Sequence, residues 1–175
     1  MLQCDNPFWR FSLAVYAAPG VADECLALQD TGGVDVNVLL FCAWLGSRRV
    51  VLTQEHLVVI VSAVQPWREG VVQPLRGLRR DIKARPDFAH ESIAALRNDV
   101  AALELRAEQI EQAMLHEITH AMEPAGTVSA ESAMRHNILL LLAGRNETEP
   151  ERLIEAALAH ARDPTTAGGE ARACA

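Results

Sequence analysis

The chain of 175 residues is 50% hydrophobic and 5% aromatic, so it is long enough to bury the core of one domain without disulfides or metal. Its formal net charge of −7 argues against a general attraction to nucleic acid, because phosphate binding needs clustered lysine and arginine. Ala, Leu, Glu and Arg recur while Tyr16 is the only tyrosine, and this composition favours helix over sheet.

The first two predicted helices are bounded by proline and glycine. Asn6 before Pro7 predicts an N-cap and a helix that runs to about residue 17. A second helix over 21–30 is expected to end at Gly32-Gly33, because glycine tolerates the left-handed backbone found at helix ends.

The third predicted helix, over 36–45, is apolar around its whole circumference. A helix of this kind must be covered by neighbours on all sides, so we expect it at the centre of the fold. Asp35 is its predicted N-cap, and Gly46 is expected to end it.

The next two predicted helices contain β-branched residues and prolines. Thr53 predicts the N-cap of a fourth helix, although the β-branched run 57–61 also allows a strand there. Pro66 is expected to open a fifth helix, which Pro74 kinks or restarts before 75–84.

The clearest predicted element is a long helix over about 89–122. Its apolar residues alternate steps of three and four and form a continuous seam, made of Ile93, Leu96, Val100, Leu103, Ala107, Ile110 and Met114. We expect this seam to pack inside the domain, and a homodimer joined along it is the alternative.

The C-terminal part predicts a seventh helix between Ser129 and Gly144, and a last helix that Pro150 introduces. The segment 163–175 is rich in Gly, Thr and Ala and has nothing to bury, so we expect a disordered tail. The sequence therefore predicts an all-α single domain over 1–162, a bundle of about eight helices around the central helix.

Neither a membrane span nor an oxidised thiol is expected. The apolar runs 57–64 and 138–143 are far shorter than the roughly 20 residues that a membrane span requires. The four cysteines show no Cys-x-x-Cys spacing, so we expect reduced thiols and a cytoplasmic protein.

Residues 65–85 form a basic segment with a net charge of +4, since six basic residues stand against Glu69 and Asp81. Arg76 shares a helix face with Arg79 or Arg80, and such a pair can gather a carboxylate or phosphate. Pairing of these arginines with acidic neighbouring helices is the simpler interpretation.

The segment His116-Glu117-Ile118-Thr119-His120 matches the His-Glu-x-x-His pattern of zinc peptidases, in which both histidines bind zinc and the glutamate acts as base. The extended form of this pattern is broken, because Glu123 and Gly126 stand where it requires glycine and histidine. Helical phase also directs His116 and His120 away from the seam, toward water. A zinc-dependent hydrolase that uses His116, Glu117 and His120 is therefore only an alternative.

Three polar residues, Gln29, Asp35 and Asn37, interrupt the apolar stretch 28–44, where a buried polar group without a partner costs roughly 1–3 kcal/mol. They either cap and brace helix ends locally, or they line a cleft beside tryptophan and arginine. The candidate ligand-binding or partner-binding residues are Gln29, Asp35, Asn37, Trp67, Arg68 and Arg76.

Several blocks of the sequence resemble a single family: Asn6-Pro7-Phe8-Trp9, Leu28-Gln29-Asp30, Gly33-Val34-Asp35-Val36-Asn37, Leu39-Leu40-Phe41, Trp44-Leu45-Gly46 and Pro66-Trp67-Arg68. Over about 6–118 the chain is similar to a short proteobacterial family of unknown function. The resemblance implies a small, helical, cytoplasmic bacterial protein, and the His-Glu-x-x-His pattern is not part of its signature. We expect a non-catalytic binding or adaptor module without a cofactor, for an unknown protein or a small anionic ligand.

Overall fold

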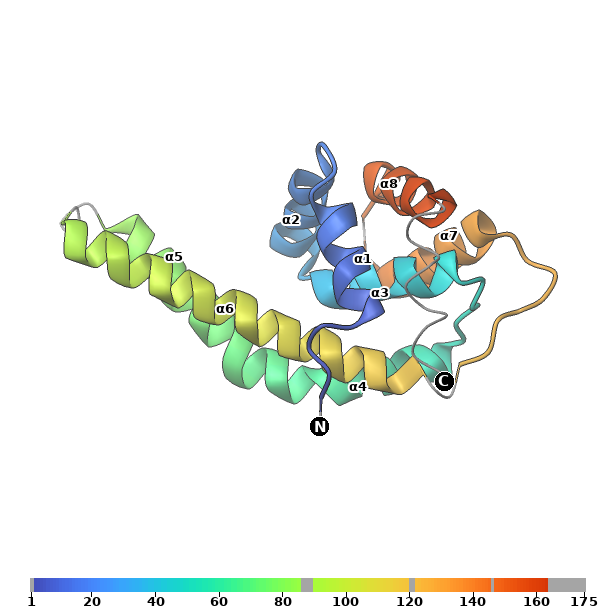
Figure 1. The fold of residues 1–175 in the computed structure, drawn as a ribbon, viewed down its shortest axis with the longest axis horizontal. Helices are drawn as coiled ribbons and strands as arrows, with labels where there is room; N and C mark the ends of the chain where they lie inside the picture. The colour runs from blue at the N-terminus through green and yellow to red at the C-terminus, as the bar shows by residue number, and fades with distance from the viewer. Residues whose placement is uncertain (1, 86–89, 120–121, 146, 164–175) are drawn as a thin grey trace.

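The computed structural model describes residues 2–85, 90–119, 122–145 and 147–163, and these contain helices and no strand (Figure 1). The helices are α1 (Pro7–Tyr16), α2 (Val21–Gly32), α3 (Val36–Ser47), α4 (Gln54–Trp67), the π-helix η1 (Arg68–Val72), α5 (Gln73–Ala84), α6 (Glu91–Ile118), α7 (Ala130–Leu142) and α8 (Glu151–Arg162). The prediction of an all-α fold is confirmed.

Helix α3 lies at the centre of the fold, as its sequence predicts. All of its residues from Asn37 to Gly46 are buried. It packs against α1, α2, α6, α7 and α8, and its contact with α7 is the most extensive. An apolar helix in this place leaves its few polar groups no access to water, so they need partners within the protein.

The predicted N-caps form as expected. The Asn6 side chain accepts a hydrogen bond from the Trp9 N–H at 2.9 Å, and the Asp35 side chain accepts one from the Asn37 N–H at 3.0 Å. Thr53 caps α4 in a capping box, and Gly33 ends α2 with a φ of 62°. These contacts span two or three residues, which is why the sequence predicts them well.

The prediction that Pro66 opens a new helix is wrong. Pro66 lies inside α4, and the chain continues through η1 into α5 without a break. The N–H of Gln73 donates to the carbonyl of Arg68, five residues back. The wider π-turn lies between Pro66 and Pro74, so it accommodates prolines that lack an N–H for the regular ladder.

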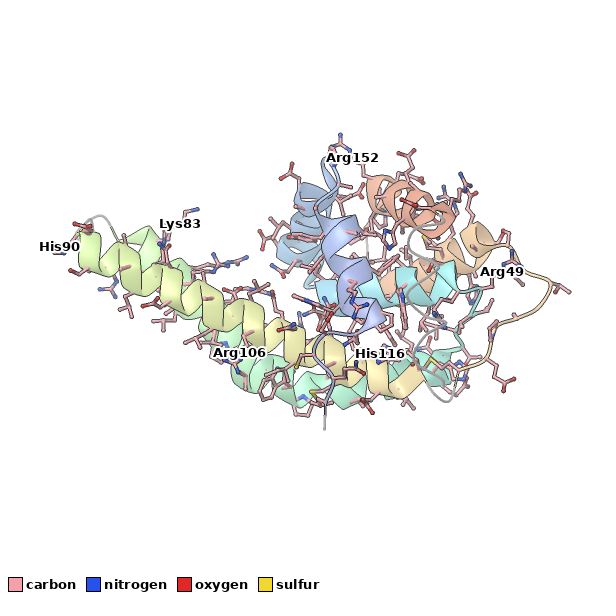
Figure 2. All side chains as sticks on the ribbon, in the orientation of Figure 1. Arg49, Lys83, His90, Arg106, His116 and Arg152 are labelled. Atoms are coloured by element: carbon pink, nitrogen blue, oxygen red, sulfur yellow. The ribbon has the colours of Figure 1, made fainter. Side chains whose placement is uncertain are left out.

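Helices α5 and α6 form a two-helix arm that extends away from the other helices, and Lys83 and His90 lie near its tip (Figures 1 and 2). Helix α6 is the predicted long helix, and it braces α1, α3, α4 and α5. The predicted seam is divided: Val100 and Ala107 are buried, whereas Leu96 is 54% exposed and Leu103 is 53% exposed.

Gly46 does not end α3, contrary to the prediction, but lies buried in its last turn. A Cβ atom at this position would overlap the backbone N and Cα atoms of Met134. Glycine therefore permits the close approach of α3 and α7.

Two remaining predictions concern the chain ends and the membrane. Residues 164–175 of the predicted tail lie outside the described residues, and the domain boundary at 162 stays a prediction. Among the described residues, no single helix has the length and apolar character to cross a membrane, and α1 with α2 has them only as a pair bent by 99°.

Substitution at two helical glycines should change stability in opposite directions. We expect Gly46→Ala to lower the free energy of unfolding by about 3 kcal/mol, because the new methyl group meets the backbone of α7. Gly77→Ala should raise it by up to about 1 kcal/mol, since nothing lies within 4 Å of that position in α5. Urea denaturation of both variants measures the difference, and equal effects would contradict the close approach.

Candidate ligand-binding site

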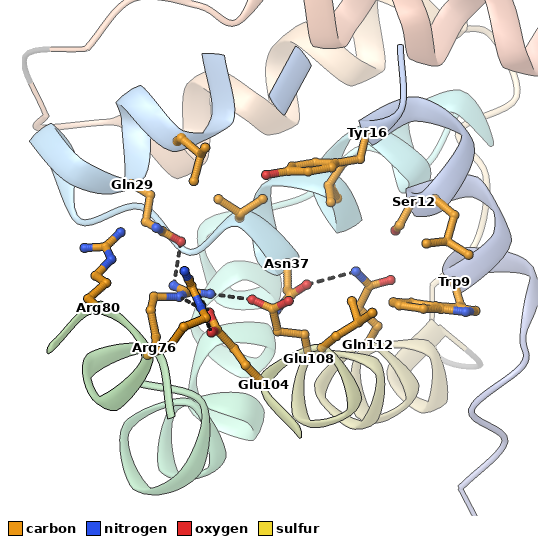
Figure 3. Close-up of a pocket in the computed structure, with 16 residues that line it drawn as sticks. Trp9, Ser12, Tyr16, Gln29, Asn37, Arg76, Arg80, Glu104, Glu108 and Gln112 are labelled. Atoms are coloured by element: carbon orange, nitrogen blue, oxygen red, sulfur yellow. Dashed lines mark hydrogen bonds and ion pairs between the residues drawn. The ribbon is translucent and has the colours of Figure 1, made fainter. Parts of the chain in front are cut away.

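A cavity of about 250 Å³ lies where α1, α2, α3, α5 and α6 meet (Figure 3). Its apolar wall includes Trp9 and Tyr16 from α1 and the half-exposed side chains of Leu13, Leu26 and Leu105. Polar side chains from all five helices complete it. An apolar cavity with a few converging polar groups is the usual form of a small-molecule site.

One side of the cavity is a network of charged side chains centred on Arg76. The Arg76 guanidinium donates to Glu104 at 2.9 Å, to Gln29 at 2.5 Å and to Glu108. Arg79 also donates to Glu104, at 2.5 Å. Arg76 and Arg79 of the basic segment are therefore paired with acidic residues of α6, as the simpler interpretation of the sequence predicts.

The pairing keeps Glu104 ionised although it is only 5% exposed. Burial by itself raises the pKa of Glu104, but the hydrogen bonds from Arg79 and Arg76 outweigh it, and the pKa falls below the usual value. Two carboxylates thus face two guanidinium groups in this wall, and their charges balance.

A series of hydrogen-bonded buried side chains also borders the cavity, through Asn37 and Gln112, and continues to Glu111, which does not line it. The Asn37 Nδ2 donates to Glu111 Oε2 at 3.0 Å, and the Asn37 Oδ1 accepts from Gln112 Nε2 at 2.8 Å. Glu111 is fully buried, and Asn37 and Gln112 are 7% and 3% exposed. Asn37 therefore finds both partners on α6, more than 70 residues away along the chain.

Three buried polar atoms among the described residues have no hydrogen-bond partner: Ser12 Oγ, Gln112 Oε1 and Glu111 Oε1. Ser12 and Gln112 line the cavity, and Figure 3 shows them together beside Trp9, at the end away from Arg76. A buried polar atom without a hydrogen-bond partner lowers the stability of the fold, so each of the three needs a physical explanation.

The explanation for Glu111 is a bound proton. Burial, together with the nearby Asp35 carboxylate, raises the pKa of Glu111 to about 9. The protonated carboxyl group can donate a hydrogen bond to the neighbouring Asp35 carboxylate. At neutral pH the pair therefore carries one negative charge, which the ion pair between Asp35 and Arg68, 2.9 Å long, balances.

The six residues selected from the sequence do not form one site. Gln29, Asn37 and Arg76 line the cavity. Asp35 and Arg68 line a second cavity of about 160 Å³ between α3, α4, η1 and α7. Trp67 lines neither cavity, and its Nε1 donates to the carbonyl of Ala107 at 2.9 Å, which fastens the end of α4 to α6.

Sequence analysis missed the contribution of α6 to the cavity. Glu104, Glu108 and Gln112 are spaced four residues apart, so they share one face of the long helix. A polar stripe beside an apolar seam is a readable signal, but it is equally typical of a solvated helix face. Only the packing of α5 and α3 against this stripe distinguishes a cavity wall from a solvated helix face.

The His-Glu-x-x-His segment is not part of either cavity. His116 is half-buried, with its ring 5.7 Å from that of Trp44, so the expectation that it points into water is wrong. His120 lies outside the described residues. Within the described part of the chain no group of three or more His, Cys, Asp or Glu side chains is placed to hold a metal. No observation here supports a zinc hydrolase.

Residues 7–115 match the family described as "Protein of unknown function (DUF2390)", and the chain belongs to this family. The resemblance drawn from the sequence blocks, to a family of unknown function, is thereby confirmed. No curated protein and no solved structure matches the chain. All residues that line the larger cavity fall within the matched region, whereas α7 and α8 lie outside it.

The proton on Glu111 makes the stability of the protein depend on pH. The native state keeps this proton up to about pH 9, whereas the unfolded chain loses it near pH 4.5. The native state therefore binds more protons between these values, and the free energy of unfolding should fall as the pH rises.

Glu111→Gln provides the test, because the amide offers a donor and an acceptor in the same place without a titrating proton. We expect the wild type to lose stability relative to this variant between about pH 5 and pH 9, as measured by urea denaturation. Glu155→Gln, at an exposed glutamate of α8, is the control and should follow the wild type. Parallel stability curves for wild type and Glu111→Gln would contradict a protonated Glu111.

Proposed function

We propose that this protein is a non-catalytic helical binding module that holds a small molecule in the larger cavity. The observation that carries the proposal is the lining of that cavity, in which aromatic and leucine side chains meet buried, directed polar groups. Gln29, Asn37 and Arg76 are the sequence-selected residues that belong to it.

The charges of the wall favour an uncharged ligand over the anionic ligand expected from the basic segment. Arg76 and Arg79 already donate to carboxylates, and Arg80 pairs with Asp30 at 2.9 Å. An anion would have to displace Glu104 or Glu108 from these arginines and leave a carboxylate unpaired, which is costly for a buried group. The volume of about 250 Å³ favours a ligand smaller than most drugs.

We also propose a cytoplasmic location. Cys4, Cys25 and Cys42 are free thiols, and burial raises the pKa of both Cys25 and Cys42 to about 12. Thiols that stay protonated and unpaired are typical of a reducing compartment.

Occlusion of the cavity tests the binding proposal. We expect fragments of up to about ten non-hydrogen atoms, a size chosen for cavities below the common range, to shift amide resonances around the cavity in ¹H–¹⁵N spectra. Leu26→Trp should weaken this binding at least tenfold, because the indole occupies space that the 41% exposed leucine leaves open.

Leu139→Trp is the matched control, since Leu139 is 51% exposed on α7 and away from the cavity. It should leave fragment binding unchanged. Equal binding by the two tryptophan variants, or shifts confined to other surfaces, would overturn the proposal.

A structural homodimer is a second candidate, favoured by the exposed part of the α6 seam. Leu96 and Leu103 are seven residues apart on one helix face, and each is more than half exposed. This spacing is the repeat by which helices of two chains pack. We propose that the exposed leucines of one copy pack against the same leucines of a second copy of the chain.

Light scattering coupled to size exclusion tests the homodimer. We expect a dimer for the wild type and a monomer when Leu96 and Leu103 are both changed to Lys, because charges in the seam oppose association. Leu139→Lys, at an equally exposed leucine of α7, should stay dimeric. A monomeric wild type at high concentration would rule this candidate out.

A further inference from the structure

The orientation of the Gln112 amide is set by its hydrogen bonds in the buried series of side chains. Glu111 Oε2 accepts a hydrogen bond, so the Asn37 side chain must turn its Nδ2 toward Glu111. The remaining polar atom of the Asn37 side chain, Oδ1, faces Gln112 of α6 and needs a hydrogen-bond donor there. Gln112, which lines the cavity, supplies Nε2, and its carbonyl oxygen Oε1 is left buried without a partner.

The other end of this hydrogen-bonded series, at Glu111 and Asp35, holds the orientation of the Gln112 amide in place. Glu111 lies next to the Asp35 carboxylate, and Asp35 is fixed by the N–H of Asn37 at 3.0 Å and by Arg68 at 2.9 Å. Reversal of the Gln112 amide would place Oε1 against Asn37 Oδ1, and two acceptors repel each other. In this arrangement Gln112 Oε1 is the acceptor that stays unpaired.

Ser12 lies at the same end of the cavity. Ser12 is 2% exposed, its hydroxyl has no partner, and Figure 3 shows Ser12 beside Trp9 near Gln112. A hydroxyl both donates and accepts, so it can serve a ligand carbonyl while Gln112 serves a ligand N–H. Aromatic and leucine side chains surround this polar end.

We propose that the cavity selects uncharged molecules by an N–H or O–H group that donates to Gln112 Oε1, as in a primary amide, an alcohol or an N–H heterocycle beside an apolar body. This inference rests on the proposed binding function and names the ligand chemistry of that site. A molecule without a donor leaves the buried oxygen unpaired, and a carboxylate places negative charge against it, so the site rejects both.

Three molecules of nearly the same shape separate these possibilities: benzamide, acetophenone and benzoate. All three carry an aromatic ring and a carbonyl oxygen, but only benzamide carries an N–H donor. We expect benzamide to bind the wild type about tenfold more tightly than acetophenone, the ratio expected for one buried hydrogen bond. Benzoate should bind most weakly. Titrations followed by ¹H–¹⁵N spectra give the three dissociation constants.

Gln112→Leu removes the acceptor and should bring the ratio between benzamide and acetophenone to about one. Gln109→Leu is the matched control on α6, because the Gln109 side chain donates to the Cys4 carbonyl and does not line the cavity. Ser12→Ala should weaken benzamide and acetophenone alike, since both retain the carbonyl that Ser12 serves. If Gln112→Leu does not fold, the ratio in the wild type still decides the proposal.

The outcomes distinguish this inference from the proposed function. A preference for benzamide that Gln112→Leu abolishes and Gln109→Leu keeps supports the inference. Equal binding of benzamide and acetophenone, or tightest binding of benzoate, overturns it and leaves a small-molecule site in place. Absence of binding by all three also overturns it, and the fragment titration with Leu26→Trp then decides the proposed function.

Discussion

Complete burial of one helix is the constraint on which the rest of this structure depends. Because α3 is covered on every side, the Asn37 amide in its first turn cannot reach water and must be satisfied within the protein. Helix α6 provides both partners, Glu111 and Gln112. This single requirement fixes the register of α6 against α3 and directs the Gln112 amide. The proton on Glu111 has a different cause, because burial and the Asp35 carboxylate raise its pKa.

A second set of interactions attaches helix α5 to α6 and to the centre of the fold. Helix α5 has no buried residue among those described, so apolar burial contributes little to its position. Arg76 and Arg79 hold it against Glu104 and Glu108 of α6, and Arg76 also reaches Gln29 of α2. The positive charge of the basic segment is thereby balanced at the cavity, so its net charge does not describe the surface that a ligand meets.

The cavity lies between these two sets of interactions, and its polar groups also support the fold. Asn37 and Arg76 connect helices and line the cavity at the same time. Asp35, Arg68 and Trp67 hold the same helices together from outside it, through a cap, an ion pair and a hydrogen bond to Ala107. The block from Gln29 to Arg76 therefore combines structural and cavity-lining roles, which is why spacing alone cannot separate them.

The sequence by itself determined the all-α class, the central position of α3 and most helix ends. Caps such as Asn6 and Asp35 act over two or three residues, and an apolar circumference demands burial wherever the helix goes. Only the tertiary structure decided that Asn37 meets Glu111, that Arg76 meets Gln29 and that Gly46 admits α7. These contacts join residues that are 47 or more positions apart, and helix periodicity carries no information about which faces meet at that range.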